Sequence, residues 1–326
     1  MKIAIIGAGM AGLSCAQALS AAGHAVQVLD KGRGPGGRMS TRRIETPQGQ
    51  VSFDHGAQFF TVRDQAFAAR AAAWQAAGVA APWPAAGPEA LVGVPGMNAP
   101  IRAMAQTLDV TWQARVDEVV RDGEAWRLSG EGFAPFSADA VVVAAPSEQA
   151  AVLLANIAPD MAAQAAAVVS EPCWTMMAAF AGPLSLAADV LRQDGPLAWA
   201  ARNSAKPGRT GPEAWVVQAS PDWSRAHLEE GADQVAHALL AALAEAHGQP
   251  LPETLSLQAH RWRYARTTAQ GGAPPWVGAD ADRRLRRLAG RRPGGGRLAL
   301  RPRSGRRHPG RILKRRGQGR LEAYGR

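Results

Sequence analysis

Hydrophobic positions along this chain come in two patterns, and their order predicts an α/β fold. Residues 3–6 are an unbroken apolar run and residues 26–29 are apolar except for Gln27, and a stretch with helical character separates the two. Such runs are typical of strands buried on both faces of a parallel sheet. Residues 140–145 repeat the pattern before Pro146 leads into a helix. We expect these three strands to share one parallel sheet.

The intervening segments predict further elements. In chain order we expect a strand at 51–54, an alanine-rich helix at 64–77, a Pro/Gly-rich loop at 82–100, a short helix at 99–108, and strands at 110–114, 116–121 and 126–129. The last three strands, with the turn Asp122-Gly123, favour an antiparallel excursion from the parallel sheet. Beyond residue 160 we expect strands at 175–182, 197–202, 215–219 and 254–263, with a helix at 232–247, which together predict a second, mixed or antiparallel sheet.

A glycine-rich turn follows the first predicted strand. Gly7 permits the tight turn, Gly9 lets the backbone approach a phosphate, and Gly12 lets the helix lie close to the strand. Asp30 follows Gly12 by 18 residues and ends the second strand, where it would accept hydrogen bonds from ribose hydroxyls. The pattern predicts a dinucleotide site, the alternative being a glycine turn required only for packing.

A second glycine-rich loop at 34–37 lies behind the first and favours FAD over NAD. Arg38 follows it and offers a planar fork of donors that suits a diphosphate, although a solvated surface arginine is the alternative. Gln58 stands beside Phe59 and Phe60 and could bond a flavin edge, although an amide next to a strand end is often only structural.

Composition places the chain among globular proteins of about two domains, with 326 residues and 47% apolar content. Cys15 and Cys173 lack CxxC spacing, which favours reduced core thiols and a cytoplasmic location. The His residues suggest no metal site, and we expect no apolar run of about 18 residues to span a membrane. The formal charge of +10 is unevenly distributed along the chain. Residues 283–326 hold 17 Lys and Arg and one acidic residue, whereas residues 1–282 hold 20 Lys and Arg and 26 acidic residues.

Several further segments carry a family resemblance. They are Gly37-Arg38, the run from Asp54 to Phe60 (DHGAQFF), the strand at 141–146, and residues 203–209 (NSAKPGR), 215–224 (WVVQASPDWS) and 260–265 (HRWRYA). In this combination the chain resembles the renalase-like flavoproteins of the wider flavin amine oxidase superfamily. The likeness covers roughly residues 1–284.

The resemblance implies noncovalent FAD in a Rossmann-like domain (1–60 and about 100–155) beside a substrate domain with a mixed or antiparallel sheet (about 61–99 and 156–282). It also implies oxidation of misreduced dihydronicotinamide isomers of NAD(P), with oxygen as electron acceptor. Carried over by position, the cofactor residues would be Gly7, Gly9, Met10, Ala11 and Gly12 at the pyrophosphate, Asp30 and Lys31 at the ribose, Gly37, Arg38 and Met39 on the phosphate and flavin side, Ala57 and Gln58 at the isoalloxazine, and Val116 at the adenine.

Hydride transfer to a flavin needs no protein nucleophile, so no catalytic residue is assigned. Candidate walls of the substrate site are Trp174, Trp199, Trp215 and Trp262, although Trp more often fills a core. His260 and Arg261 are candidates for binding substrate phosphates, with a solvated strand face as the alternative. A flavin amine oxidase stays open as a second reading, but it would require an aromatic cage and a lysine at the flavin. The chain has two Tyr, and Lys206, its one lysine between Lys31 and the tail, is a further candidate substrate residue.

The resemblance stops at Arg283, where the family's second FAD segment, a C-G-D-W turn and an R-V-E-G-A-x-x-S-G helix, is missing. Residues 285–300 read LRRLAGRRPGGGRLAL. Plausible GC-rich codons for this stretch, read from the second base of Leu285, give CGDWPGGGRVEGAWPS. We therefore hypothesise a frameshift near Arg284.

The frameshift hypothesis makes residues 283–326 a translation by-product that is predicted to be disordered, because it holds few apolar residues. It also leaves open weak FAD binding or none. A third reading is a non-catalytic protein that binds nucleic acid through this basic tail, for which we expect only nonspecific contact.

Overall fold

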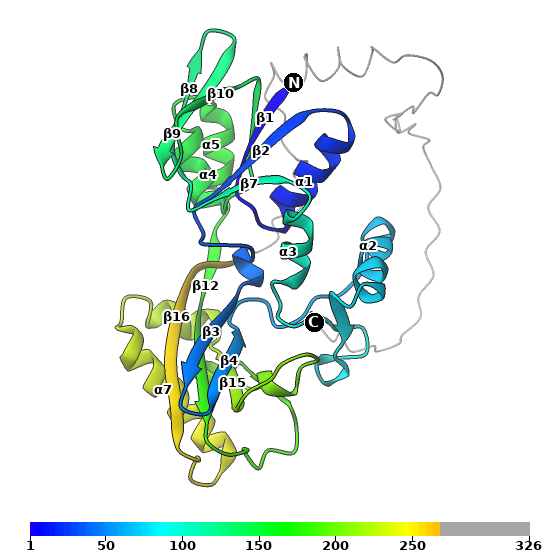
Figure 1. Ribbon diagram of the computed structural model, residues 1–326. Coiled ribbons are helices and arrows are strands. Elements are labelled where there is room, and N and C mark those ends of the chain that lie inside the picture. The colour runs from blue at the N-terminus through cyan, green and yellow to red at the C-terminus, as the bar shows by residue number, and fades with distance from the viewer. Residues whose placement is uncertain (268–326) are drawn as a thin grey trace, which may run out of the picture. The chain divides into compact units, whose positions relative to one another are not determined.

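A computed structural model describes residues 1–267 of the chain. Its first sheet is parallel, with the strand order β11 (Ala140–Val143), β1 (Lys2–Ile6), β2 (Ala25–Asp30), β7 (Asp109–Trp112). Both faces of this sheet are covered, which explains its mostly apolar strands. Ile3 and Ile5 face α1 (Met10–Ala21) and α3 (Ala99–Ala105), whereas Ala4 and Ile6 face the opposite side. The three strands expected in one parallel sheet are confirmed (Figure 1).

The expected antiparallel excursion is confirmed in part and corrected in part. Strands β8 (Arg115–Asp122), β9 (Ala125–Glu131) and β10 (Phe136–Ala138) form an antiparallel sheet, with Gly123 at φ +58° in the predicted turn. The strand expected at 110–114 was wrongly assigned to this excursion, because β7 pairs in parallel with β2. A short, half-buried strand has the same polarity pattern at the edge of a parallel or an antiparallel sheet, so the sequence pattern did not reveal that this strand pairs with β2.

The second sheet is antiparallel, with the order β13 (Val190–Leu191), β14 (Trp199–Arg202), β15 (Glu213–Gln218), β12 (Ser170–Phe180), β16 (Thr254–Thr267). Helix α7 (Ala232–His247) covers one face through Val235, Leu239 and Leu243 (Figure 1). The other face packs against the hairpin of β3 (Thr41–Thr46) and β4 (Gly49–Asp54). The strands and the helix expected after residue 160 are therefore confirmed.

The remaining elements connect these sheets. They are α2 (Gln65–Ala76), β5 (Ala80–Pro82), β6 (Leu91–Gly93), α4 (Ser147–Leu154), α5 (Pro159–Ala166), α6 (Pro221–Ala226) and the single turns of 3₁₀-helix η1 (Gly37–Met39), η2 (Pro84–Ala86), η3 (Gly195–Leu197) and η4 (Asn203–Ala205). The expected loop at 82–100 contains β6, which pairs with β5. No helix within residues 1–267 is long and apolar enough to cross a membrane. The domain boundaries stay a prediction, and the tail expected at 283–326 lies outside the described residues.

Candidate flavin and substrate site

The turn between β1 and α1 has the close backbone contacts of a dinucleotide cradle. Gly7 has φ +109°, and a Cβ on Gly12 would lie 1.9 Å from the Gly7 carbonyl oxygen, so helix and turn touch there. A Cβ on Gly9 would meet no described atom within 4 Å. Met10 and Ala11 open α1, whose first N–H groups and dipole favour a bound anion. This turn fits the pyrophosphate of a dinucleotide.

Asp30 anchors the end of β2 to both neighbouring segments. Its Oδ2 accepts a hydrogen bond from the Ala8 N–H at 2.6 Å, and its Oδ1 accepts one from the Gly32 N–H at 2.7 Å. Its carbonyl oxygen accepts from the Ala114 N–H at 2.9 Å, which brings the start of β8 and Val116 to this edge. Because a carboxylate has about four acceptor positions, Asp30 retains capacity for ribose hydroxyls. Lys31 instead reaches Gln149, with 3.0 Å between Nζ and Oε1.

The second glycine loop lies directly against the first. Gly37 has φ +52°, and a Cβ on it would lie 3.6 Å from the Cα of Gly9. Arg38 is exposed, with Nη1 3.4 Å from the Ala265 carbonyl oxygen, whereas Met39 packs into the core beside the cradle. The fold therefore brings the two predicted phosphate loops together.

The segment after β4 continues from these loops into a cavity. The Ala57 N–H donates to the Arg38 carbonyl oxygen at 2.8 Å, and a Cβ on Gly56 would lie 2.1 Å from that same oxygen. Glycine is therefore needed at 56 for the two loops to approach this closely. Arg38, Gly56 and Ala57 line one side of a cavity of about 400 Å³. The cofactor cradle and this cavity are thus contiguous.

The floor of the cavity comes from one face of the second sheet. Trp199 of β14, Gln218 of β15, Thr175 of β12 and His260 of β16 stand in register across four strands. Trp262 follows two residues along β16, on the same face. Among these residues, Trp199, Gln218 and Trp262 line the cavity.

Three of the predicted substrate residues lie on the opposite face of this sheet. Trp174 and Trp215 are buried in the cluster under α7, and the Trp174 Nε1–H donates to the His227 carbonyl oxygen at 2.9 Å. Arg261 bonds the Glu229 carboxylate, with 3.0 Å between Nη1 and Oε2. The prediction of a substrate role is therefore corrected for these three, because side chains alternate along a strand. None of them lines the cavity.

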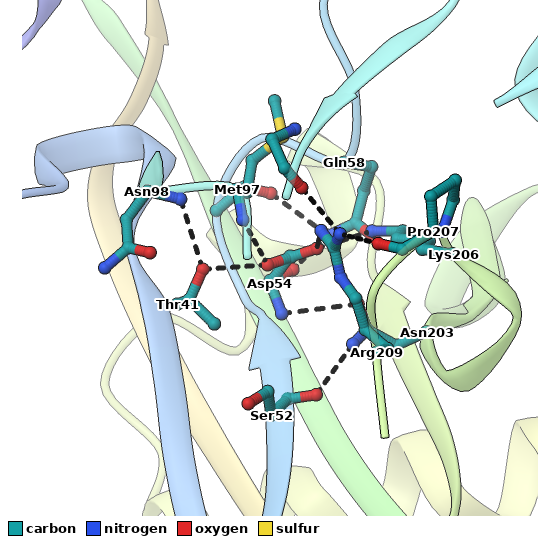
Figure 2. Close-up of polar contacts among 12 residues, drawn as sticks. Thr41, Ser52, Asp54, Gln58, Met97, Asn98, Asn203, Lys206, Pro207 and Arg209 are labelled. Atoms are coloured by element: carbon teal, nitrogen blue, oxygen red, sulfur yellow. Dashed lines mark hydrogen bonds and ion pairs between the residues drawn. The ribbon is translucent and has the colours of Figure 1, made fainter. Parts of the chain in front are cut away.

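A buried charge cluster lies around Asp54 (Figure 2), and Gln58 connects it to Gly56 of the cavity lining. Asp54 Oδ2 lies 3.2 Å from Nζ of Lys206 and is also bonded by Arg209, while its Oδ1 accepts from the Thr41 hydroxyl and the Met97 N–H, both at 2.8 Å. Burial alone would raise the pKa of Asp54, but the two cations lower it to about 2. Burial, with a contribution from Arg209, lowers the pKa of Lys206 to about 8 despite Asp54.

Gln58 belongs to this cluster and not to the cavity. Its Oε1 accepts from Lys206 Nζ at 3.0 Å, and its Nε2 donates to the carbonyl oxygens of Asp54 and Gly56. The side-chain amide is therefore occupied at both ends, so the structural alternative holds for it. The predicted substrate residue Lys206 is likewise fully buried and does not line the cavity.

Two histidines lie beside the cavity. The rings of His55 and His260 have centroids 5.0 Å apart, and the His55 ring stacks on Trp262 at 5.3 Å. Burial, mutual repulsion and the nearby Arg42 lower the pKa of His55 to about 4, and burial and Arg42 lower that of His260 to about 4. Both rings are therefore neutral at pH 7, which makes His260 a poor ligand for phosphate.

Comparison with known families agrees with this geometry. Residues 5–73 match the NAD(P)-binding Rossmann-like domain, and residues 79–299 match the flavin containing amine oxidoreductases. The second match covers more than half of the chain, so the chain belongs to the flavin containing amine oxidoreductase family. It is accordingly a FAD-dependent oxidoreductase by family, and the residues of the cradle fit that cofactor.

Solved structures show the same fold at low sequence identity. A protein described as a protoporphyrinogen oxidase from Exiguobacterium sp. 255-15 has a TM-score of 0.62 at 12% identity, over 88% of this chain and 90% of that one. Cyclohexylamine oxidase from Brevibacterium oxydans IH-35A has a TM-score of 0.60 at 13% identity, over 81% and 86%. A putrescine oxidase variant redesigned in cofactor binding has a TM-score of 0.57 at 14% identity, over 79% and 84%.

Proposed function

We propose that the protein is a renalase-like oxidase, which removes a hydride from a dihydronicotinamide isomer of NAD(P) and passes the electrons to oxygen. The observation that carries this proposal is the lining of the cavity. Its aromatic residues are Trp199 and Trp262, which offer flat apolar area to a planar ring. The one acidic residue of the lining among residues 1–267, Glu171, is bonded by Arg266 at 2.7 Å. The described lining therefore offers no unpaired carboxylate to an ammonium group.

Each part of the chain has a defined task in this proposal. Gly9 and the start of α1 hold the pyrophosphate, Asp30 holds the ribose, and Arg38 lies where the cradle meets the cavity. Bound FAD supplies the two-electron acceptor. Because hydride transfer to a flavin needs no protein nucleophile, the work of the cavity residues is to orient the substrate ring against the cofactor and exclude water.

The decisive experiment measures the flavin absorbance bands of the purified protein after incubation with FAD. Under anaerobic conditions we expect bleaching by dihydronicotinamide isomers and none by cyclohexylamine or putrescine. Readmitting oxygen should restore the bands and consume one oxygen molecule per substrate if oxygen is the acceptor. Bleaching by amines alone would identify an amine oxidase instead, and a frame-restored preparation that stays colourless with added FAD would reject the flavin site.

We also propose that the reading frame shifts near Arg284, in residues that lie outside the described part of the chain. The family match runs to residue 299, beyond that point, so protein comparison alone does not locate the shift. The encoding DNA decides the matter, because a single-base change must restore the CGDW segment. Two preparations, this chain and one with the restored frame, should then differ in FAD affinity, with the restored chain binding more tightly. Loss of a salt-dependent DNA affinity on truncation at 283 would instead favour the nucleic-acid reading of the tail.

A further inference from the structure

Gln218 occupies a special position in the cavity floor. Its Nε2 donates to the Gly56 carbonyl oxygen at 2.7 Å, which fixes the amide orientation because a carbonyl oxygen only accepts. Its Oε1 has no hydrogen-bond partner among residues 1–267, although the side chain lines the cavity. One end of this amide thus holds the cavity wall, and the other end is an acceptor without a partner.

The surroundings restrict what this acceptor can bind. Trp199 stands in register with Gln218 on the neighbouring strand, and both line the cavity with Trp262. Trp262 also holds the wall, because its Nε1–H donates to the His55 carbonyl oxygen at 2.7 Å. A neutral acceptor beside two indole rings suits a flat heterocycle that carries an amide N–H. A ligand that covers this oxygen without supplying a donor would leave it buried and unpaired, which is costly, so the acceptor selects for a ligand that supplies a donor.

We propose that Oε1 of Gln218 accepts a hydrogen bond from the carboxamide NH₂ of the substrate's nicotinamide ring and so determines specificity for it. This inference rests on the proposed function and deepens it. Gln58, the amide that sequence reasoning selected, has both ends occupied within the protein. Gln218 is the amide that remains available to a ligand.

The test compares two ligands that differ in one group: NAD⁺, and its 3-acetylpyridine analogue, in which a methyl group replaces the NH₂. Affinities for the FAD-loaded protein are measured by titration calorimetry, which does not depend on turnover. We expect the unmodified protein to bind NAD⁺ roughly tenfold more tightly than the analogue, which is the ratio for one net hydrogen bond. For Gln218→Met the ratio should fall to about one.

Two further variants keep the test interpretable. Gln218→Glu retains an acceptor oxygen and should keep the preference for NAD⁺, even though it loses the donor to Gly56. Gln258→Met makes the same substitution on the same face of the sheet, at a residue bonded to Arg42 outside the cavity lining, and should leave the ratio at tenfold. Urea unfolding of each variant shows whether the fold is retained.

Three results would overturn the proposal. The first is an equal ratio in the unmodified protein and Gln218→Met. The second is no preference in the unmodified protein. The third is a shifted flavin spectrum and weaker FAD binding in Gln218→Met with the ligand ratio unchanged, which would assign the acceptor to an N–H of the cofactor. If the protein oxidises dihydronicotinamides and gives any of these results, only this inference is refuted. Failure of the bleaching assay would refute the proposed function itself.

Discussion

The Nζ atom of Lys206 lies 3.2 Å from Oδ2 of Asp54, and both side chains are fully buried. Arg209 bonds the same carboxylate oxygen, so two cations share one anion in the core. Asp54 ends β4, whereas the cations follow η4, some 150 residues later in the chain. This cluster joins the hairpin β3–β4 to the segment between η4 and β15 (Figure 2).

Removing the anion should destabilise the protein strongly. Asp54→Asn leaves two buried cations without their counter-charge, and we expect it to cost about 3–5 kcal/mol in the free energy of unfolding. Urea denaturation measures this value. Asp117→Asn is the matched control, because Asp117 pairs with Arg115 at a surface where both side chains are about half exposed, and it should cost less than about 1 kcal/mol. Equal effects of the two substitutions would contradict the role given to the cluster.

Lys206→Met should lower the free energy of unfolding by less than Asp54→Asn does, because Arg209 still neutralises Asp54. It should also remove a pH effect. The folded pKa of Lys206, about 8, lies below its ordinary value of 10.5, so between these pH values the unfolded chain binds a proton that the folded chain does not. Stability from this group therefore rises as the pH increases from 8 to 10.5. Unfolding curves at several alkaline pH values should show the rise in the unmodified protein and a smaller one in the variant.

The histidine pair predicts sensitivity to mild acid. His55 and His260 have folded pKa values of about 4, below the ordinary 6.5, so the unfolded chain binds more protons between these values. Stability should consequently fall as the pH is lowered from 6.5 to 4. The groups facing the pair are Arg42, Asp54, Ser40 and Trp262.

The matching variant is His260→Gln, which removes one titrating ring and its repulsion of His55. We expect a shallower loss of unfolding free energy over the same pH range. His237→Gln is the control, because His237 is exposed on α7 and its ring bonds the Asp233 carbonyl oxygen of the same helix. An identical acid profile for His260→Gln and the unmodified protein would show that the pair does not govern this loss.

The glycines of the cradle should separate folding from cofactor binding. A Cβ at position 12 would lie 1.9 Å from the Gly7 carbonyl oxygen, so Gly12→Ala should destabilise the fold itself. A Cβ at position 9 meets open space, so Gly9→Ala should unfold at the same urea concentration as the unmodified protein while binding FAD at least tenfold more weakly.

Gly182→Ala is the control for both substitutions, because its nearest contact would be an ordinary one of 3.9 Å to Pro252. It should change neither the unfolding midpoint nor the FAD affinity. If Gly9→Ala bound FAD as tightly as Gly182→Ala, the pyrophosphate would have to lie elsewhere.

Much of the fold could be predicted from local pattern. The parallel strands β1, β2 and β11 are mostly apolar because both of their faces are covered, and helix α7 occupies the predicted span 232–247. The cradle could also be predicted, because a strand, three glycines and Asp30 follow one another at the required spacing within 30 residues. These features depend on neighbours in the chain, which is the information that a sequence contains directly.

The composition of the cavity required the tertiary structure. Alternation along β15 separates Trp215 from Gln218, but only the packing of α7 on one face shows which of them reaches the cavity. Lys206 and Gln58 were likewise selected as isolated residues, although Lys206 bonds both Asp54 and Gln58 across the fold. Local sequence therefore determined the strands and the phosphate loops, whereas the register of distant strands determined which side chains face a ligand, because burial depends on contacts between segments far apart in the chain.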